Sequence, residues 1–346
     1  MTKHTVLLTG GAGFIGSNFI INVLKRFNSL NIINLDKLTY AGNLNNLKEV
    51  SKNKRYRFEK GDICNRLFVD KLFKKYAFDV VVNFAAESHV DRSILKPGSF
   101  VKTNIVGPQI LLDAIKANPV KKFIQISTDE VYGEKRKGKS KEFDILNPNN
   151  PYSASKACAD LLCRSYTKTF GLPVIIVRLS NNYGPYQFPE KLVPLMILNA
   201  INYKHLPVYG SGKNIRDWMY VEDSCNAIIK IIKQGEPGEV YNIGASNLQS
   251  NIKFVQKICR LVSKKIKISS EEILSRIEYI ADRPAHDARY CLDTSKIYNE
   301  TGWTPKTDLD RGLEKTVNWY LNNKTWVTNV MNKDYLKYYK LNYTNR

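Results

Sequence analysis

Short apolar runs alternate with amphipathic stretches along the first half of the chain. Helical patterns follow the first run and recur near residues 98–117 and 151–170, and Pro108 predicts a delayed start or a kink in the first of these helices. Alternation of strand and helix is typical of a doubly wound parallel sheet, so the predicted fold class is α/β. The apolar runs predict buried strands at residues 5–9, 31–35, 56–59, 79–84, 122–127 and 173–179.

A glycine-rich turn directly follows the first predicted strand. Gly10, Gly13 and Gly16 allow a tight turn and a close backbone approach to a pyrophosphate, which the N-terminus of the following helix attracts. The second strand ends in Asp36, twenty positions after Gly16, where an acid bonds the ribose hydroxyls of a dinucleotide. Together these features predict a Rossmann-type sheet that binds NAD rather than NADP.

Two further strand ends supply candidates for the same cofactor. Asp62 follows the third strand, and two interpretations stay open from its position alone: a contact to the adenine amine, or a cap for the helix that begins near Asn65. The fourth strand runs into Phe84, Ala85 and Ala86. Small residues at the carboxyl end of a parallel strand suit a ligand that lies across the sheet.

The pattern loosens beyond residue 180 into short helices, strands and loops. We expect a Rossmann NAD-binding domain over residues 1–180, to which elements near 215–245 return. Residues 181–325 are predicted to form a smaller, interleaved α+β lobe that binds the substrate. The tail at 331–346, rich in Tyr and Lys, stays open as a frayed appendage or an edge contact.

The stretch at residues 127–156 carries the candidate chemistry. A hydroxyl and two carboxyls, those of Thr128, Asp129 and Glu130, follow the fifth strand. Asn150 and Pro151 suit the N-cap and the first turn of a helix. Tyr152 and Lys156 lie one turn apart on this predicted helix, so they share a face. A nearby ammonium, helped by a bound nicotinamide cation, would lower the pKa of a tyrosine from about 10 toward the range of a useful base. Such spacing is common on surface helices, but the cofactor fingerprint favours the catalytic interpretation.

Charge and cysteine content narrow the class of protein. In 346 residues, 53 Lys and Arg against 32 Asp and Glu give a net charge of +21, which would suit nucleic acid. The lysines are scattered rather than gathered on one stripe, so we expect no nucleic-acid partner. Six cysteines without a C-x-x-C pair favour a reduced protein without a structural metal. No signal peptide or membrane-spanning run is visible, which predicts a cytoplasmic protein with no membrane partner.

The motifs together resemble an extended short-chain dehydrogenase/reductase, and more closely the nucleotide-sugar (dTDP- or UDP-glucose) 4,6-dehydratases. The glycine turn and the Tyr-x-x-x-Lys spacing specify only the superfamily. The Thr128-Asp129-Glu130 triplet is more specific, because the related 4-epimerases need no acid/base carboxyl pair. The resemblance covers nearly the whole chain and is carried by residues 10–16, 61–63, 85–93, 127–133, 152–156, 181–186, 216–218 and 282–290.

The resemblance implies a reaction in three stages that yields the 4-keto-6-deoxy sugar. Tyr152 would take the O4 proton while NAD⁺ takes hydride from C4 of the glucose, with Lys156 on the nicotinamide ribose and Thr128 on O4. Glu130 would remove the C5 proton, Asp129 would protonate the departing C6 hydroxyl, and NADH would return its hydride to C6. Asp129 must then hold a proton while Glu130 is ionised, an arrangement that neighbouring carboxyls in a dry pocket favour.

The resemblance also implies the binding residues, no metal site and a homodimer formed through the helices near 98–117 and 151–170. The cofactor-binding residues expected are Gly10, Gly13, Phe14, Ile15, Gly16, Asp36, Lys37, Asp62, Ile63, Phe84, Ala85, Ala86, Ser88, Thr103, Tyr152, Lys156 and Asn181. The substrate-binding residues expected are Ser88, Thr128, Asn182, Lys191, Leu192, Pro207, Tyr209, Arg216, Asn251, Arg283 and His286.

Two departures from the family pattern stand out: Ala285 replaces a usual glycine, and Cys158 replaces a usual Ala or Ser. One geometric condition also follows. Successive residues of a strand face opposite ways, so Asp129 and Glu130 can share a site only if the backbone leaves strand geometry after Thr128.

Three questions stay open at this point. A UDP-sugar 4-epimerase or decarboxylase on the same scaffold is the nearest alternative, and the carboxyl pair argues against the epimerase. A non-catalytic NAD- or nucleic-acid-binding protein is the alternative of another class. Both dTDP-glucose and UDP-glucose stay candidate substrates, because the two bases differ by one methyl group.

Overall fold

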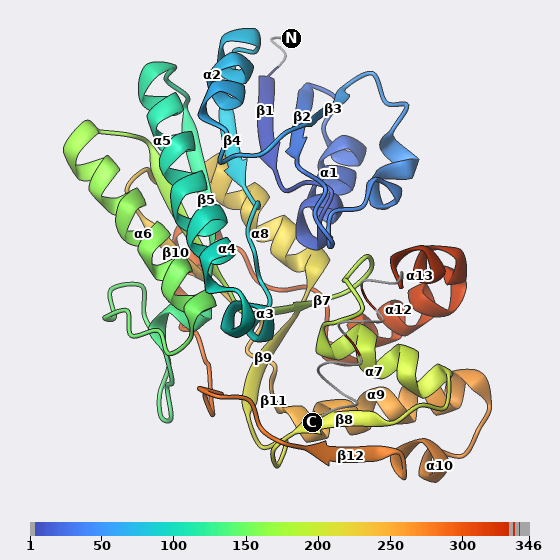
Figure 1. Ribbon diagram of the computed structural model, residues 1–346. Coiled ribbons are helices and arrows are strands. Elements are labelled where there is room, and N and C mark those ends of the chain that lie inside the picture. Colours follow the sequence, from blue (N-terminus) through green and yellow to red (C-terminus); the bar gives the residue numbers. More distant parts are fainter. Residues whose placement is uncertain (1–3, 332–334, 336–338, 340–346) are drawn as a thin grey trace.

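A seven-stranded, fully parallel sheet forms the larger part of the molecule, in the order β10-β6-β5-β4-β1-β2-β3 (Figure 1). The computed structural model describes residues 4–331 together with Tyr335 and Tyr339. This sheet confirms the predicted α/β doubly wound class. Its strands are β1 (His4–Thr9), β2 (Leu30–Asp36), β3 (Tyr56–Lys60), β4 (Val80–Asn83), β5 (Lys122–Thr128), β6 (Val174–Leu179) and β10 (Val240–Ile243).

Helices cover both faces of the sheet because its strands are apolar on both sides. On one face lie α1 (Phe14–Arg26), α8 (Val221–Gln234), α11 (Ser295–Thr301) and the 3₁₀ helix η1 (Leu44–Val50). On the other face lie α2 (Arg66–Lys75), α5 (Gly107–Ala117) and α6 (Pro151–Phe170), with α3 (Val90–Leu95) and α4 (Pro97–Val101) at the end of this layer (Figure 1).

Pro108 lies in the first turn of α5, and the helical backbone before it continues back to Pro97. A π-helical turn, η2 (Lys102–Val106), separates α4 from α5, and the N–H of Gly107 bonds the Lys102 carbonyl five residues back. A proline in a regular helix removes one bond and clashes with the carbonyl four residues earlier. The widened turn just before Pro108 accommodates both effects.

A second lobe lies below the sheet in Figure 1. It has its own apolar core, to which α7, α9 and α12 contribute, and two small sheets with the strand orders β11-β9-β7 and β12-β8. Its elements are β7 (Asn181–Tyr183), α7 (Leu192–Ile201), β8 (Leu206–Tyr209), β9 (Ile215–Tyr220), β11 (Leu248–Ser250), α9 (Asn251–Ile266), α10 (Ser270–Leu274), β12 (Ile277–Ile280), α12 (Leu309–Asn322) and α13 (Lys324–Val330).

The chain crosses between the two parts several times. After β9 in the second lobe it returns through α8 to β10, the last strand of the large sheet. The domain limits expected from the sequence stay a prediction, and most of the tail at 331–346 lies outside the described residues. Within residues 4–331, no helix is long and apolar enough to cross a bilayer, and no group of His, Cys, Asp and Glu is arranged to hold a metal ion.

Candidate active site

A cavity of about 300 Å³ lies along the carboxyl ends of the parallel strands. The glycine turn forms one wall, and the residues after β4, β5 and β6 form the other. Each of the seventeen cofactor-binding candidates borders this cavity. They are Gly10, Gly13, Phe14, Ile15, Gly16, Asp36, Lys37, Asp62, Ile63, Phe84, Ala85, Ala86, Ser88, Thr103, Tyr152, Lys156 and Asn181.

The glycine turn accepts glycine alone at two of its positions. Gly10 has a φ of +69°, and a Cβ there would lie 2.6 Å from the backbone nitrogen of Ala85. A Cβ at Gly16 would lie 2.5 Å from the carbonyl oxygen of Gly10. No side chain caps α1, whose N-cap is Gly13, so the first N–H groups of this helix stay available to an anion in the cavity.

Asp36 closes β2 and is held by the backbone on both of its oxygens. Oδ2 accepts from the Ala12 N–H at 2.9 Å and Oδ1 accepts from the Leu38 N–H at 2.8 Å. Burial raises the pKa of this carboxyl, and the two N–H groups oppose that shift. The side chain is therefore fixed at the rim of the cavity before any ligand binds.

Asp62 does not cap α2. The N-cap of this helix is Asn65, whose Oδ1 accepts from the Phe68 N–H at 3.1 Å. Asp62 instead accepts from the Cys64 N–H at 2.9 Å, lies 3.5 Å from the Lys37 ammonium, and borders the cavity. The helix-cap interpretation is wrong, and the cofactor interpretation stays a prediction.

Thr128, Asp129 and Glu130 all border the cavity. The strand β5 ends at Thr128, so the backbone leaves strand geometry at the point that is required for Asp129 and Glu130 to share a site. A 3₁₀ helix, η3 (Asp129–Tyr132), begins directly after Thr128. The Thr128 hydroxyl lies 3.2 Å from Asp129 Oδ1 and accepts from the Glu130 N–H at 3.3 Å. Asn150 Nδ2 donates to Glu130 Oε2 at 3.4 Å. The two carboxyls therefore belong to one site.

Asp129 has the environment of an acid that keeps its proton. It is 3% exposed, and its Oδ2 has no hydrogen-bond partner among the described residues. Burial raises the pKa of Asp129 well above its usual value, and the negative charge of Glu130 raises it further. A carboxyl in this state can donate a proton at neutral pH.

Tyr152 and Lys156 lie on the first turns of α6. Asn150 and Pro151 begin this helix, as the sequence predicts, and a capping box joins Asn150 to Ser153. Lys156 is 4% exposed and donates to the Ile126 carbonyl at 2.5 Å. Burial lowers the pKa of Lys156 to about 8, while the charge of Asp160 opposes this shift.

The pKa of Tyr152 is raised above its ordinary value, whereas a lowered pKa is expected when a nicotinamide cation is bound. Burial raises it, the charge of Glu130 adds to the rise, and a hydrogen bond with Thr128 opposes it. The chain by itself therefore keeps the phenol protonated. A phenolate needs more positive charge beside the ring than the protein alone supplies.

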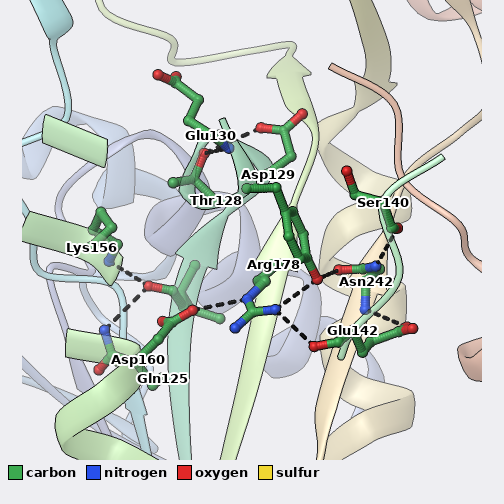
Figure 2. A network of polar contacts seen from close by, with 12 residues as sticks. Gln125, Thr128, Asp129, Glu130, Ser140, Glu142, Lys156, Asp160, Arg178 and Asn242 are labelled. Atoms are coloured by element: carbon green, nitrogen blue, oxygen red, sulfur yellow. Dashed lines mark hydrogen bonds and ion pairs between the residues drawn. The ribbon is translucent and has the colours of Figure 1, made fainter. Parts of the chain in front are cut away.

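A buried polar network connects α6 to the neighbouring strands (Figure 2). Asp160, one turn after Lys156, bonds Arg178 Nε of β6 at 2.9 Å, and both side chains are at most 1% exposed. Arg178 Nη1 donates to the Tyr132 hydroxyl at 2.6 Å, which in turn donates to Asn242 Oδ1 at 2.8 Å. Because the network joins β6, β10 and η3 to α6, it fixes the helix relative to the carboxyl pair.

Four of the substrate-binding candidates border the same cavity: Ser88, Thr128, Asn182 and Lys191. Lys191 Nζ donates to the Ser88 carbonyl at 2.7 Å, which connects the second lobe to the segment after β4. The remaining candidates lie in the second lobe beyond the lining of this cavity. They are Leu192, Pro207, Tyr209, Arg216, Asn251, Arg283 and His286.

Most of the polar candidates in the second lobe gather around Asp91. The Tyr209 hydroxyl donates to Asp91 Oδ2 at 2.9 Å, and Arg283 Nη1 lies 3.8 Å from Oδ1. The rings of Tyr209 and His286 are 6.2 Å apart. Burial lowers the pKa of Arg216, and the charges of Glu130 and Arg283 also act on it, so Arg216 lies close to both. The group around Asp91 therefore adjoins the carboxyl pair of Asp129 and Glu130.

One prominent part of the site was not expected from the sequence. Glu190 is buried in the cavity wall and accepts from Arg92 Nε at 2.8 Å. The Arg92 guanidinium lies over the Tyr40 ring at 3.8 Å, and burial raises the pKa of both Tyr40 and Glu190. Its position directly before Lys191 was the available signal, because a residue beside a candidate contact shares its location.

The cavity fits a dinucleotide by its own chemistry. Ser127 Oγ and Asn181 Oδ1 are buried in its wall, and neither has a partner among the described residues. A ligand with hydroxyl and amide groups would satisfy both atoms. The free helix N-terminus suits a pyrophosphate, and the fixed Asp36 carboxylate suits ribose hydroxyls.

Comparisons with known proteins agree with this geometry. The profile of the family described as GDP-mannose 4,6 dehydratase matches residues 7–316. The dTDP-glucose 4,6-dehydratase of Neisseria meningitidis is 48% identical over 346 residues, covering 95% of this chain and 97% of its own. That of Escherichia coli is 46% identical over 352 residues, again covering 95% and 97%.

Solved structures show the same relationship. The dTDP-glucose 4,6-dehydratase of Bacillus anthracis in complex with NAD is 44% identical, with a TM-score of 0.86, and covers 94% of this chain and 99% of its own. The enzyme of Streptomyces venezuelae with NAD and TYD bound is 41% identical, with a TM-score of 0.87 and coverage of 93% and 98%. A UDP-glucuronic acid 4-epimerase from Bacillus cereus is 29% identical, with a TM-score of 0.83, and covers 92% of this chain and 99% of its own.

The resemblance seen in the sequence motifs is thereby confirmed. The fold is common to dehydratases and epimerases, while these dehydratases are 41–48% identical to this chain and the epimerase is 29% identical. The chain belongs to the nucleotide-sugar 4,6-dehydratase family of extended short-chain dehydrogenases/reductases, whose members use NAD.

Proposed function

We propose that this hydro-lyase converts dTDP-glucose to dTDP-4-keto-6-deoxyglucose. The observation that carries the proposal is that two carboxyls, Asp129 and Glu130, line the same cavity as Tyr152, Lys156 and the glycine turn. Relatives named as dTDP-glucose 4,6-dehydratases support thymine as the base. An epimerase needs the Tyr-Lys pair and has no use for the two carboxyls.

The chemistry that bound NAD would supply is removal of hydride from C4 of the sugar and its return to C6. The glycine turn, the α1 N-terminus and Asp36 would hold the adenosine diphosphate half. Lys156 would bond the nicotinamide ribose. Tyr152 would remove the O4 proton as C4 is oxidised. The positive charge of the oxidised nicotinamide ring would offset the rise in the pKa of Tyr152 that burial causes.

The carboxyl pair divides the elimination of water between a base and an acid. The C4 ketone acidifies the C5–H bond, and Glu130 takes that proton. Asp129 then donates its proton to the departing C6 hydroxyl, a role for which its buried and protonated state prepares it. After exchange with solvent, Glu130 would return a proton to C5 when hydride reaches C6. Thr128 bonds O4 and, through its contacts to both carboxyl residues, keeps the pair in register.

The nucleotide would extend from this cavity into the second lobe. Arg216 and Arg283 are the candidate ligands of the diphosphate, because a guanidinium fork matches phosphate oxygens. Lys191 borders the cavity and donates to the Ser88 carbonyl. The polar group around Asp91 thus continues the path that starts at the carboxyl pair.

Transfer of a deuterium label tests the reaction. The chain is incubated with dTDP-glucose and with UDP-glucose, each labelled at C4, and the products are examined by mass spectrometry and NMR. We expect the label at C6, hydrogen from solvent at C5, and a higher kcat/KM for the dTDP sugar. Label retained at C4 would indicate an epimerase instead, and a preference for UDP-glucose would overturn the proposed base.

We propose further that two copies of the chain form a dimer through α4, η2 and α6. Val101, Val106 and Leu161 on these helices are apolar side chains that are 50%, 40% and 54% exposed. Burying them against a second copy would remove that apolar area from water. A cytoplasmic location is also part of the proposal, since all six cysteines are free thiols.

A further inference from the structure

The segment between β2 and β3 forms the side of the cavity next to Asp36. Thr39, Tyr40 and Gly42 in this segment border the cavity, and η1 follows directly. Asn46, in the first turn of η1, is only 1% exposed. A buried amide needs partners for both its oxygen and its nitrogen, because leaving either unpaired costs free energy.

Asn46 finds those partners in two distant parts of the chain. Its Nδ2 donates to the Ala12 carbonyl of the glycine turn at 2.9 Å. Its Oδ1 accepts from the indole Nε1–H of Trp326, 280 residues away, at 2.7 Å. One side chain therefore connects α13, in the second lobe, to the turn that faces the cofactor.

The backbone of Ala12 continues this connection toward the cavity. Its carbonyl also accepts from the Asn43 N–H at 3.0 Å, and its N–H, in the preceding peptide group, donates to Asp36 Oδ2 at 2.9 Å. Four groups thus lie in series: the indole of Trp326, the amide of Asn46, the backbone of Ala12 and the Asp36 carboxylate.

Trp326 is itself held rigidly. It is 8% exposed and lies in an aromatic cluster with Trp319, Tyr186 and Tyr320, at ring distances of 4.9, 6.2 and 6.3 Å. The cluster fixes the direction of the indole N–H, a donor that needs an acceptor when buried. The bond to Asn46 is therefore a defined contact between the two parts of the molecule.

We propose that Asn46 and Trp326 are positioning residues for NAD, and that α13 controls how tightly the glycine turn and Asp36 retain the cofactor. The inference rests on the proposed role of Asp36 in cofactor binding. It assigns to the C-terminal helices a role beyond packing, since the second lobe would stabilise the cofactor site of the first. Neither residue touches the reacting atoms.

The substitution Trp326→Phe separates the hydrogen bond from the packing. Phenylalanine keeps an aromatic ring in the cluster but removes the N–H, which leaves Asn46 Oδ1 buried without its donor. We expect NAD to dissociate at least about fivefold faster, because the free-energy contribution of one hydrogen bond that supports the cofactor site is lost. The dissociation rate is followed by displacement of bound NADH, whose fluorescence changes on release, and thermal unfolding of the cofactor-free chain is recorded in parallel.

Trp319→Phe is the matched control, because it trims an indole of the same cluster and leaves the Trp326–Asn46 bond in place. We expect its NAD dissociation rate to equal that of the unaltered chain. Asn46→Ala should weaken NAD retention as Trp326→Phe does, and combining the two should cost less than the sum, because both break one connection. With NAD saturating, Trp326→Phe should leave the KM for the sugar nucleotide unchanged.

Three outcomes would overturn the inference: an unchanged dissociation rate in Trp326→Phe, an equal change in Trp319→Phe, or strict additivity of Trp326→Phe with Asn46→Ala. If the Trp326→Phe variant does not fold, the NAD dissociation rate of the Asn46→Ala variant is compared with that of the unaltered chain instead. This comparison tests the same connection from its other end. Failure of the unaltered chain to bind NAD at all would instead refute the proposed cofactor site, so the two failures are distinguishable.

Discussion

Asp129 and Glu130 show how two adjacent residues acquire different chemical tasks. They follow one another in the chain, yet only Asp129 is deeply buried, with an oxygen that has no partner in the described residues. Glu130 accepts a bond from Asn150 and borders the cavity. In the proposed mechanism, environment rather than residue type therefore separates the acid from the base.

The substitution Glu130→Gln tests this division at the scale of one atom. The amide keeps the size and the hydrogen-bond acceptor of the side chain but cannot take a proton from C5. We expect kcat to fall by about 10²- to 10⁴-fold, the usual effect of removing a general base. The affinity for NAD, measured by fluorescence titration, should be unchanged.

Glu134→Gln is the control, since Glu134 lies four residues on, bonds the Ala288 N–H and is not in the cavity wall. It should retain full turnover. Normal turnover in Glu130→Gln would remove Glu130 from the mechanism. A parallel loss in both variants would point to general damage of the segment.

At the scale of elements, the start of α6 places two sets of groups at once. The Asn150 side chain caps the helix through the Ser153 N–H, and its Nδ2 reaches Glu130. Asn150 therefore fixes the start of the helix that carries Tyr152 and also bonds Glu130, the proposed base. The sequence predicted the cap, and the contact to Glu130 came only with the fold.

The loop that carries Arg283 and His286 contains a strained residue. Ala285 has a φ of +52°, in the left-handed region that favours glycine, which explains why its family pattern has glycine there. We expect Ala285→Gly to raise the free energy of unfolding by about 0.5–1 kcal/mol, because it relieves roughly 1–2 kcal/mol of strain against a flexibility cost of about 0.4–1 kcal/mol. Urea unfolding followed by circular dichroism measures the change.

Ala288→Gly in the same loop should have the opposite effect. Its φ is not in the left-handed region, so glycine only adds freedom to the unfolded chain and lowers stability. If both substitutions destabilise the chain equally, the loop carries no strain at Ala285.

At the scale of the whole molecule, the two parts of the chain depend on each other. The carboxyl ends of the large sheet supply the cofactor cavity, and Lys191 and Glu190 of the second part close one side of it. Trp326 and Asn46 join the parts again on the far side of the glycine turn. The site therefore exists only in the assembled fold.

The proposed dimer is tested by the mass in solution. Light scattering after size exclusion should give twice the chain mass of 39.6 kDa. Leu161→Glu places a charge on the proposed interface of α6 and should shift the mass toward one chain, because burying an unpaired carboxylate is costly.

Tyr298→Glu on α11 is the control, since Tyr298 is 57% exposed on the helix layer of the other face. It should leave the mass unchanged. A single-chain mass for the unaltered protein, or equal loss of the dimer in both variants, would contradict the proposed interface.

The sequence by itself determined the alternation of strands and helices over the first 180 residues, the glycine turn, Asp36 at the end of β2 and the cap of α6. These features arise from local rules: hydrophobic period, glycine at positive φ, and side chains that bond their own backbone. For the same reason the Tyr152–Lys156 spacing could be interpreted without any distant contact.

Only the tertiary structure decided what depends on residues far apart in the chain. It turned Asp62 from a possible cap into a residue of the cavity, buried Asp129 beside Glu130, and brought Glu190 to Arg92. It also joined Trp326 to Asn46. Burial and the electrostatics that follow from it come from packing between distant segments, and no local pattern in the chain specifies them.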